Sequence, residues 1–175
     1  MPKPSGIMSV DRRPTFVGFD PGKQGGIVAI YPTGEIQWWL MPEGDLQLLT
    51  VLQNEIAASV SPRSTIVAGV EKVNSMPGEG HKGAFTFGAG YGALKMAIAA
   101  SGFKKLDVHS RTWQAFFKIK PRGKRTKSQF KSDILLKAHE RFPEIPLWKE
   151  PRTKIKQLAI CDAMFIAEYT RLHYK

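Results

Sequence analysis

Residues 16–31, FVGFDPGKQGGIVAIY, contain two short apolar runs joined by a turn rich in glycine. Residues 16–20 are expected to form a strand and residues 27–31 a returning strand, because Pro-Gly and Gly-Gly pairs between apolar runs are typical of tight turns. A second turn leads into residues 36–41, which have the same apolar character. The sequence therefore predicts a three-stranded antiparallel meander at the start of the fold.

A helix is expected between this meander and the next apolar strand. Asp45 is a suitable N-cap, and Pro62 follows the end of the helical pattern. Residues 66–70 then form a strand that Glu71 follows directly. A strand reached through a helical crossover usually lies parallel to the strand that preceded the crossover. Asp20 and Glu71 are therefore expected at the same edge of the sheet.

The rest of the chain predicts one short strand and four further helices. The strand covers residues 106–108, and the helices cover residues 84–100, 111–117, 128–142 and 155–174. Gly88 and Gly92, in the first of these helices, each weaken it by up to about 1 kcal/mol, so they indicate close approach by another group. The candidates for that group are the sheet, a second subunit and a DNA backbone.

Three carboxylates occur where their neighbours favour burial. Asp20 and Glu71 each follow an apolar strand, and Asp162 has only apolar residues three and four positions away in the last helix. An ionised carboxylate removed from water is costly unless a partner compensates its charge. The economical interpretation is a shared site for a divalent metal. Alternatively, Asp20 opens an Asp-Pro-Gly turn, and Asp162 bonds a buried backbone donor or pairs with a lysine.

Composition favours a single domain that binds a polyanion. The chain has 175 residues, 42% of them hydrophobic, and 26 Lys and Arg against 15 Asp and Glu, which gives a net charge of +11. We expect a flexible segment at residues 1–15 and one domain at residues 16–175. The charge favours nucleic acid over an anionic membrane surface. With Cys161 as the only cysteine, and without an apolar leader or a membrane-spanning stretch, the sequence predicts a cytoplasmic protein.

Much of the excess positive charge lies in one segment. Its basic residues are Lys118, Lys120, Arg122, Lys124, Arg125, Lys127 and Lys131. Pro121 and Gly123 disfavour regular structure there, so we expect a flexible loop that follows a phosphate backbone, with a merely solvated loop as the alternative. Asn74 and Met76 lie in another loop, shortly after Glu71, where a substrate contact is expected.

The chain also carries a series of short motifs in a defined order. They are Gly18-Phe19-Asp20-Pro21-Gly22 with Gly25-Gly26, Val70-Glu71-Lys72-Val73, the glycine-rich run at 83–92, Lys127-Ser128-Gln129, and Asp162-Ala163-Met164-Phe165-Ile166-Ala167. In this order they resemble the motifs of RuvC-type Holliday junction resolvases, especially the compact phage and bacterial relatives. The resemblance runs from Val17 nearly to the C-terminus.

This resemblance implies an α/β fold of the RNase H type, with a mixed five-stranded sheet (a three-stranded antiparallel meander plus parallel strands) flanked by helices. It also implies a homodimer that nicks four-way or branched DNA with magnesium, or manganese in its place, by two symmetric sites. The charge of the clustered acids predicts two divalent ions per site. The implied setting is the nucleoid of a bacterial or phage-infected cell.

The resemblance also implies roles for individual residues. Asp20, Glu71 and Asp162 fall on the metal-binding acids of the family. Lys127 falls on a lysine close to the scissile phosphate, and Lys118 on a second basic position near it. Met76 is the candidate for a side chain inserted near the crossover.

One position departs from the family pattern. A fourth acid or a histidine usually lies about one turn before the position of Asp162, where this chain has Leu158 and Ala159. One metal ion would then be held more weakly, or the protein would bind junctions and cut them poorly. A noncatalytic branched-DNA binding protein and another RNase H-like nuclease therefore remain as alternatives.

Overall fold

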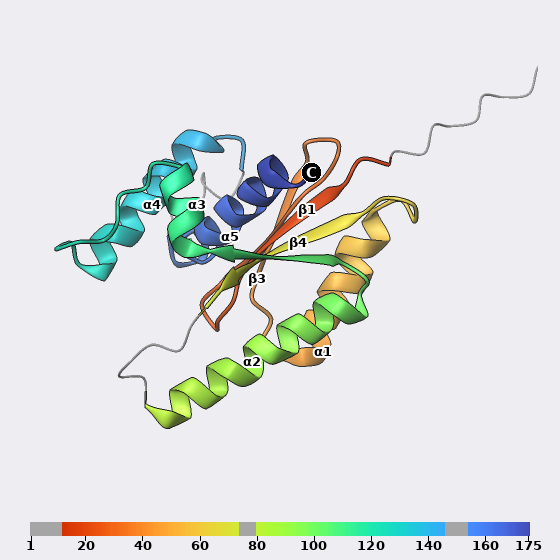
Figure 1. Ribbon diagram of the computed structural model, residues 1–175, viewed down its shortest axis with the longest axis horizontal. Coiled ribbons are helices and arrows are strands. Elements are labelled where there is room, and N and C mark those ends of the chain that lie inside the picture. Colours follow the sequence, from red (N-terminus) through yellow and green to blue (C-terminus); the bar gives the residue numbers. More distant parts are fainter. Residues whose placement is uncertain (1–11, 74–79, 146–153) are drawn as a thin grey trace, which may run out of the picture.

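The computed structural model describes residues 12–73, 80–145 and 154–175, and these form a five-stranded sheet with helices on both faces (Figure 1). The strands are β1 (Thr15–Asp20), β2 (Gly26–Ile30), β3 (Ile36–Leu40), β4 (Ile66–Lys72) and β5 (Lys104–His109). Their order in the sheet is β3-β2-β1-β4-β5. The first three strands pair antiparallel, whereas β4 lies parallel to β1 and β5 lies parallel to β4. The predicted mixed sheet of a meander and parallel strands is confirmed.

Two groups of helices cover the two faces of the sheet. The first group comprises α1 (Asp45–Thr50), its continuation through a π-helical segment (Val51–Ile56) and a 3₁₀ turn (Ala57–Ser59), and α2 (His81–Ala100). The second group comprises α3 (Ser110–Phe116), α4 (Lys127–Arg141) and α5 (Lys154–His173). Each group encloses its own buried core against the sheet.

The alternation of side chains along the central strands decides which residues face α5. Phe19 of β1 and Val70 of β4 are both buried in the core shared with α1 and α2. Successive side chains of a strand point to opposite faces. The next residues in each strand, Asp20 and Glu71, therefore lie on the face that α5 covers.

Helix α5 packs so closely on the sheet that a side chain at either of two glycines, one in β1 and one in β4, would collide with it. Gly18 and Gly69 are paired across β1 and β4 on the face that this helix covers. A Cβ at Gly18 would collide with the backbone of Ala163 and Ala167, and a Cβ at Gly69 would collide with the side chain of Thr170. The two glycines therefore let α5 come close enough to hold its own residues beside the ends of β1 and β4.

Several elements extend beyond their predicted limits. Helix α2 begins at His81 rather than at residue 84, and its first half projects past the sheet (Figure 1). Strand β1 begins at Thr15, which is fully buried, and β5 runs over Lys104–His109. A Cβ added at Gly88 or Gly92 would meet no atom within 4 Å in the described part of the chain. Packing against the sheet is therefore wrong as the reason for these two glycines, and a second subunit or DNA stays open.

Cys161 fills space in the core. It is fully buried in α5 and is a free thiol. Within the described ranges, no helix combines the length and the apolar character needed to cross a lipid bilayer.

Candidate metal centre and nucleic-acid interface

The three acids predicted from the sequence come together at the face of the sheet that α5 covers. Asp20 ends β1, Glu71 is the next-to-last residue of β4, and Asp162 is buried in α5. β1 and β4 are parallel neighbours, with Phe19 opposite Val70. The carboxylates are close enough that the charge of Asp162 acts on both of the others. Segments remote in the sequence therefore build one acidic site.

Burial and, to a smaller extent, neighbouring negative charges raise the pKa values of two of these acids. Burial raises the pKa of Asp20 well above its ordinary value, and the charges of Asp162 and Glu71 raise it further. Burial also raises the pKa of Glu71, with Asp162 adding to the rise. The positive charge of Lys131 opposes both shifts without cancelling either. A negative, partly desolvated site of this kind favours binding of a cation.

Lys131 of α4 belongs to this acidic site. Its ammonium forms an ion pair with Oδ2 of Asp162, and its side chain is 30% exposed. Burial alone would lower the pKa of Lys131, but the ion pair with Asp162 and the charge of Asp20 raise it overall. The sequence grouped Lys131 with the phosphate contacts of the basic loop, whereas the structure places it against the acids. The lysine partner considered for Asp162 is thus present together with the acidic cluster.

Trp113 is a site residue that sequence reasoning missed. Its Nε1 donates a hydrogen bond to Oε1 of Glu71 at 3.3 Å, and this bond partly offsets the rise that burial causes in the pKa of Glu71. The indole is fully buried and stacks on Phe165, with ring centroids 5.7 Å apart. The available signal was the position of Trp113 directly after the fifth strand, because β5 lies beside β4 and brings α3 to Glu71.

The donor atoms of the site suit a hard divalent cation. Carboxylate oxygens are preferred ligands of Mg²⁺, and Oδ1 of Asp162 is buried without a hydrogen-bond partner among the described residues. Leaving such an acceptor unsatisfied costs about 1–3 kcal/mol, a penalty that a cation bound there would remove. The described residues contain no group of three Asp, Glu, His or Cys side chains already arranged to hold an ion. The three acids therefore supply oxygen ligands of the kind that a divalent cation prefers, although their side chains are not in a coordinating arrangement.

Arg125 organises the basic loop between α3 and α4. Its guanidinium donates to the carbonyl oxygens of Lys120 and Pro121, at 2.7 and 2.6 Å, and forms an ion pair with Asp133. It also lies over the ring of Phe130, 5.3 Å from the centroid. Because these contacts occupy the guanidinium, Arg125 shapes the loop, and the structure does not favour the predicted DNA contact by this residue.

The other basic residues predicted to contact phosphates are exposed. They are Lys118, Lys120, Arg122, Lys124 and Lys127. Lys127 is the first residue of α4, whose N-cap, Thr126, forms a capping box with Gln129. These side chains form the solvent-facing basic surface of the loop. Asn74 and Met76, the other predicted contacts, lie outside the described residues.

Lys118 adopts an unusual backbone conformation. Its φ is 55°, at the position just after α3 where glycine is more usual. The amide of Lys118 bonds the carbonyl of Ala115, and that of Ile119 bonds the carbonyl of Gln114, which closes the end of the helix. The contact between Lys118 and a phosphate stays a prediction.

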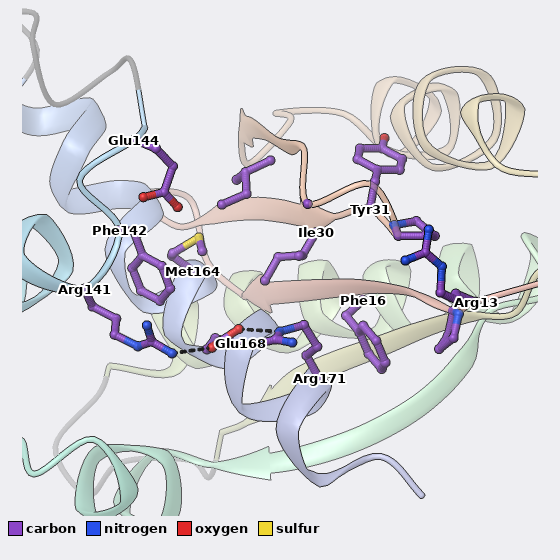
Figure 2. Close-up of a pocket in the computed structure, with 14 residues that line it drawn as sticks. Arg13, Phe16, Ile30, Tyr31, Arg141, Phe142, Glu144, Met164, Glu168 and Arg171 are labelled. Atoms are coloured by element: carbon purple, nitrogen blue, oxygen red, sulfur yellow. Dashed lines mark hydrogen bonds and ion pairs between the residues drawn. The ribbon is translucent and has the colours of Figure 1, made fainter. Parts of the chain in front are cut away.

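A second charged cluster lies at a cavity lined by Phe16, near the start of β1 (Figure 2). The buried Glu168 of α5 accepts hydrogen bonds from Arg141 at 2.8 Å and from Arg171 at 2.7 Å. The cluster borders a cavity of about 500 Å³, whose lining includes Phe16 and Tyr31. Both guanidiniums pair with the single carboxylate of Glu168, which leaves one net positive charge among these three residues. The pair between Arg141 and Glu168 joins the end of α4 to α5.

Comparison with known proteins relates the chain to solved structures. No protein-family model matches it, and no curated protein matches it. RuvC of Thermus thermophilus in complex with a Holliday junction substrate is similar, with a TM-score of 0.52, 16% identity, and coverage of 91% of this chain and 96% of that chain. A second Thermus thermophilus RuvC structure has a TM-score of 0.53, 18% identity, and coverage of 90% and 96%. This chain therefore has a RuvC-like fold of the RNase H type.

Proposed function

We propose that this protein is a structure-selective endodeoxyribonuclease that resolves four-way or branched DNA by metal-dependent phosphodiester hydrolysis. The observation that carries the proposal is the convergence of Asp20, Glu71 and Asp162 from three remote segments into one acidic site. The fold of Thermus thermophilus RuvC, a protein solved with a Holliday junction substrate, supports the choice of DNA junctions as substrate. Such a substrate is found in the cytoplasm of a bacterial or phage-infected cell, at the nucleoid.

In this proposal, each residue of the site has a separate role in hydrolysis. Asp20, Glu71 and Asp162 would hold Mg²⁺, or Mn²⁺ in its place, and Oδ1 of Asp162 is an acceptor ready for it. A bound divalent ion lowers the pKa of an attacking water and stabilises the departing 3′ oxygen. Trp113 orients the carboxylate of Glu71 through its hydrogen bond. Lys127 would stabilise negative charge that develops on the scissile phosphate.

The exposed basic loop would bind the arms of the junction. The net charge of +11 and the solvent-facing Lys118, Lys120, Arg122 and Lys124 suit a phosphate backbone. Contacts to phosphates supply affinity and position the protein but carry no sequence information directly. Such contacts favour recognition of the shape of a branched substrate.

A homodimer is part of the proposal. The outward face of α2 carries Phe85 and Met96, which are 79% and 69% exposed, with Ala89 and Gly92 between them at helical spacing. The inward face of the same helix buries Leu94 and Ile98 in the core. A helix that is apolar on both sides normally has a partner on both sides. A second copy of the chain would cover the outward face and supply a second site for the opposite strand of a junction.

The test is cleavage and binding of a synthetic four-way junction by the wild type, Asp20→Asn and Asp107→Asn. Asp107 is an exposed acid of β5 paired with Lys105, so it receives the same chemical change away from the site. We expect Asp20→Asn to abolish cleavage in Mg²⁺ while junction binding stays nearly intact, because the metal ligand is lost and the basic loop is not. Asp107→Asn should cut normally. Equal loss of cleavage and binding in Asp20→Asn would contradict the assignment.

Two observations favour a second candidate, a noncatalytic or weakly catalytic branched-DNA binding protein. Ala159 stands where the family usually has another metal ligand, and the ammonium of Lys131 already pairs with Asp162. Junction binding with no nicks in either Mg²⁺ or Mn²⁺ would favour this candidate. Cleavage of RNA hybrids or flaps in preference to junctions would instead point to another RNase H-like nuclease.

A further inference from the structure

The packing of α4 against α5 places Lys131 in the acidic site. It lies three and four residues before Ile134 and Leu135, which are buried against α5, so it is on the same inward face of the helix. The capping box at Thr126 fixes where α4 starts. Lys131 therefore reaches Asp162 from a defined helical position and not from the flexible part of the basic loop.

Lys131 is paired inside the acidic cluster. Its ammonium forms an ion pair with Oδ2 of Asp162. A desolvated lysine is costly unless it is paired, and here the pairing is with a presumed metal ligand. Lys131 thus already supplies one of the positive charges that the carboxylates require.

Among the described residues, the turn of α5 before Asp162 carries no acid where the family resemblance would place another metal ligand. Ala159 lies one turn before Asp162, and its carbonyl oxygen would be 2.9 Å from a Cβ placed on Gly26. Helix α5 is therefore pressed against the start of β2 at this turn. A second ion would have to share the remaining carboxylates with the first ion and with Lys131.

We propose that Lys131 takes the place of the second divalent ion, so that each chain binds one metal ion between Asp20, Glu71 and Oδ1 of Asp162. This inference rests on the proposed function, because it concerns the metal of the same site. The formal charges agree with it: the three negative charges of the ionised carboxylates equal the positive charges of one divalent ion and one ammonium. Two divalent ions beside the same ammonium would leave excess positive charge in the protein without DNA. This proposal replaces the two ions per site predicted from the sequence with one ion and one lysine.

The test counts bound Mn²⁺ by electron paramagnetic resonance on the full chain without DNA. We expect one Mn²⁺ per chain for the wild type and for Lys131→Arg, which keeps the positive charge. Lys131→Met should bind its first Mn²⁺ roughly tenfold more tightly or more, because a unit positive charge a few ångströms from the ion is removed. Lys137→Met, the same change farther along α4, should match the wild type. Circular dichroism checks that each variant is folded.

The outcomes distinguish a failure of this inference from a failure of the proposed function. Two Mn²⁺ ions per wild-type chain would overturn the role of Lys131 and leave the nuclease proposal standing. Unchanged Mn²⁺ affinity in a folded Lys131→Met variant would also overturn it. If Lys131→Met does not fold, the wild-type count and a comparison of Lys131→Gln with Lys131→Arg decide the question. No Mn²⁺ bound and no junction cut by the wild type would instead remove the metal-dependent nuclease itself.

Discussion

The ionisation of Asp20 links metal binding and pH to the stability of the fold. Burial and the charges of Asp162 and Glu71 raise the pKa of Asp20 well above its ordinary value, which is about 3.9 in an unfolded chain. Between these two pKa values the folded protein binds more protons than the unfolded protein. The free energy of unfolding therefore falls as the pH rises through this window. A bound cation would offset the loss at neutral pH.

The corresponding prediction concerns the melting temperature without divalent metal. In EDTA, the wild type should lose stability as the pH rises from about 4 toward neutrality, because the raised pKa of Asp20 makes ionisation in the folded state costly. Asp20→Asn should flatten this dependence and stabilise the metal-free protein at neutral pH by on the order of 1 kcal/mol. Mg²⁺ should raise the melting temperature of the wild type more than that of Asp20→Asn. Identical pH profiles for the two proteins would show that folding does not raise the pKa of Asp20.

At the scale of elements, the site depends on how closely α5 approaches the sheet. Gly18 lies two residues before Asp20 in β1, and a Cβ there would be 2.9 Å from the Cα of Ala167. That atom belongs to the helix backbone and cannot rotate away. Any added volume at Gly18 must therefore move α5, and Asp162 moves with it.

We expect Gly18→Ala to destabilise the protein toward the upper end of the range of about 1–3 kcal/mol for overpacking. It should also reduce the stabilisation by Mg²⁺, because the displaced α5 no longer holds Asp162 beside Asp20. The matched control is Gly83→Ala on α2, where a Cβ meets nothing within 4 Å. That change should be neutral or stabilising by up to about 1 kcal/mol. Denaturant unfolding with and without Mg²⁺ measures both effects, and a Gly18→Ala variant as stable as the wild type would disprove the close contact.

The elements also explain which parts of the site were predictable. The period of two along the strands, together with the helical crossover, was sufficient to bring Asp20 and Glu71 to one edge of the sheet. The apolar neighbours of Asp162 indicated an inward-facing acid. The roles of Lys131 and Trp113 depend on how α4 and α3 pack against α5 and β4, and no local pattern encodes those distances. The basic residues of one segment consequently looked equivalent in sequence, although Lys131 and Arg125 have internal partners.

At the scale of the whole molecule, the basic loop and the exposed apolar residues of the outward face of α2 lie on opposite sides of the sheet. The basic loop and the acidic site belong to the side of α3, α4 and α5. The exposed apolar stripe belongs to α2, which lies on the opposite face of the sheet and projects past it (Figure 1). A second copy bound at α2 would leave both basic loops free for DNA.

The dimer is tested by light scattering coupled to gel filtration. The wild type should have about twice the chain mass of 19.5 kDa, and Met96→Lys should reduce this to the mass of one chain, because a charge in the centre of an apolar interface is left unpaired. Leu136→Lys is the control, since Leu136 is 60% exposed on α4, away from α2. Met96→Lys should still nick junctions, but one strand at a time, because it keeps Asp20, Glu71 and Asp162 while losing the second site. A wild type that remains a single chain at micromolar concentration would contradict the homodimer. The exposed apolar residues of α2 would then have to contact a different partner.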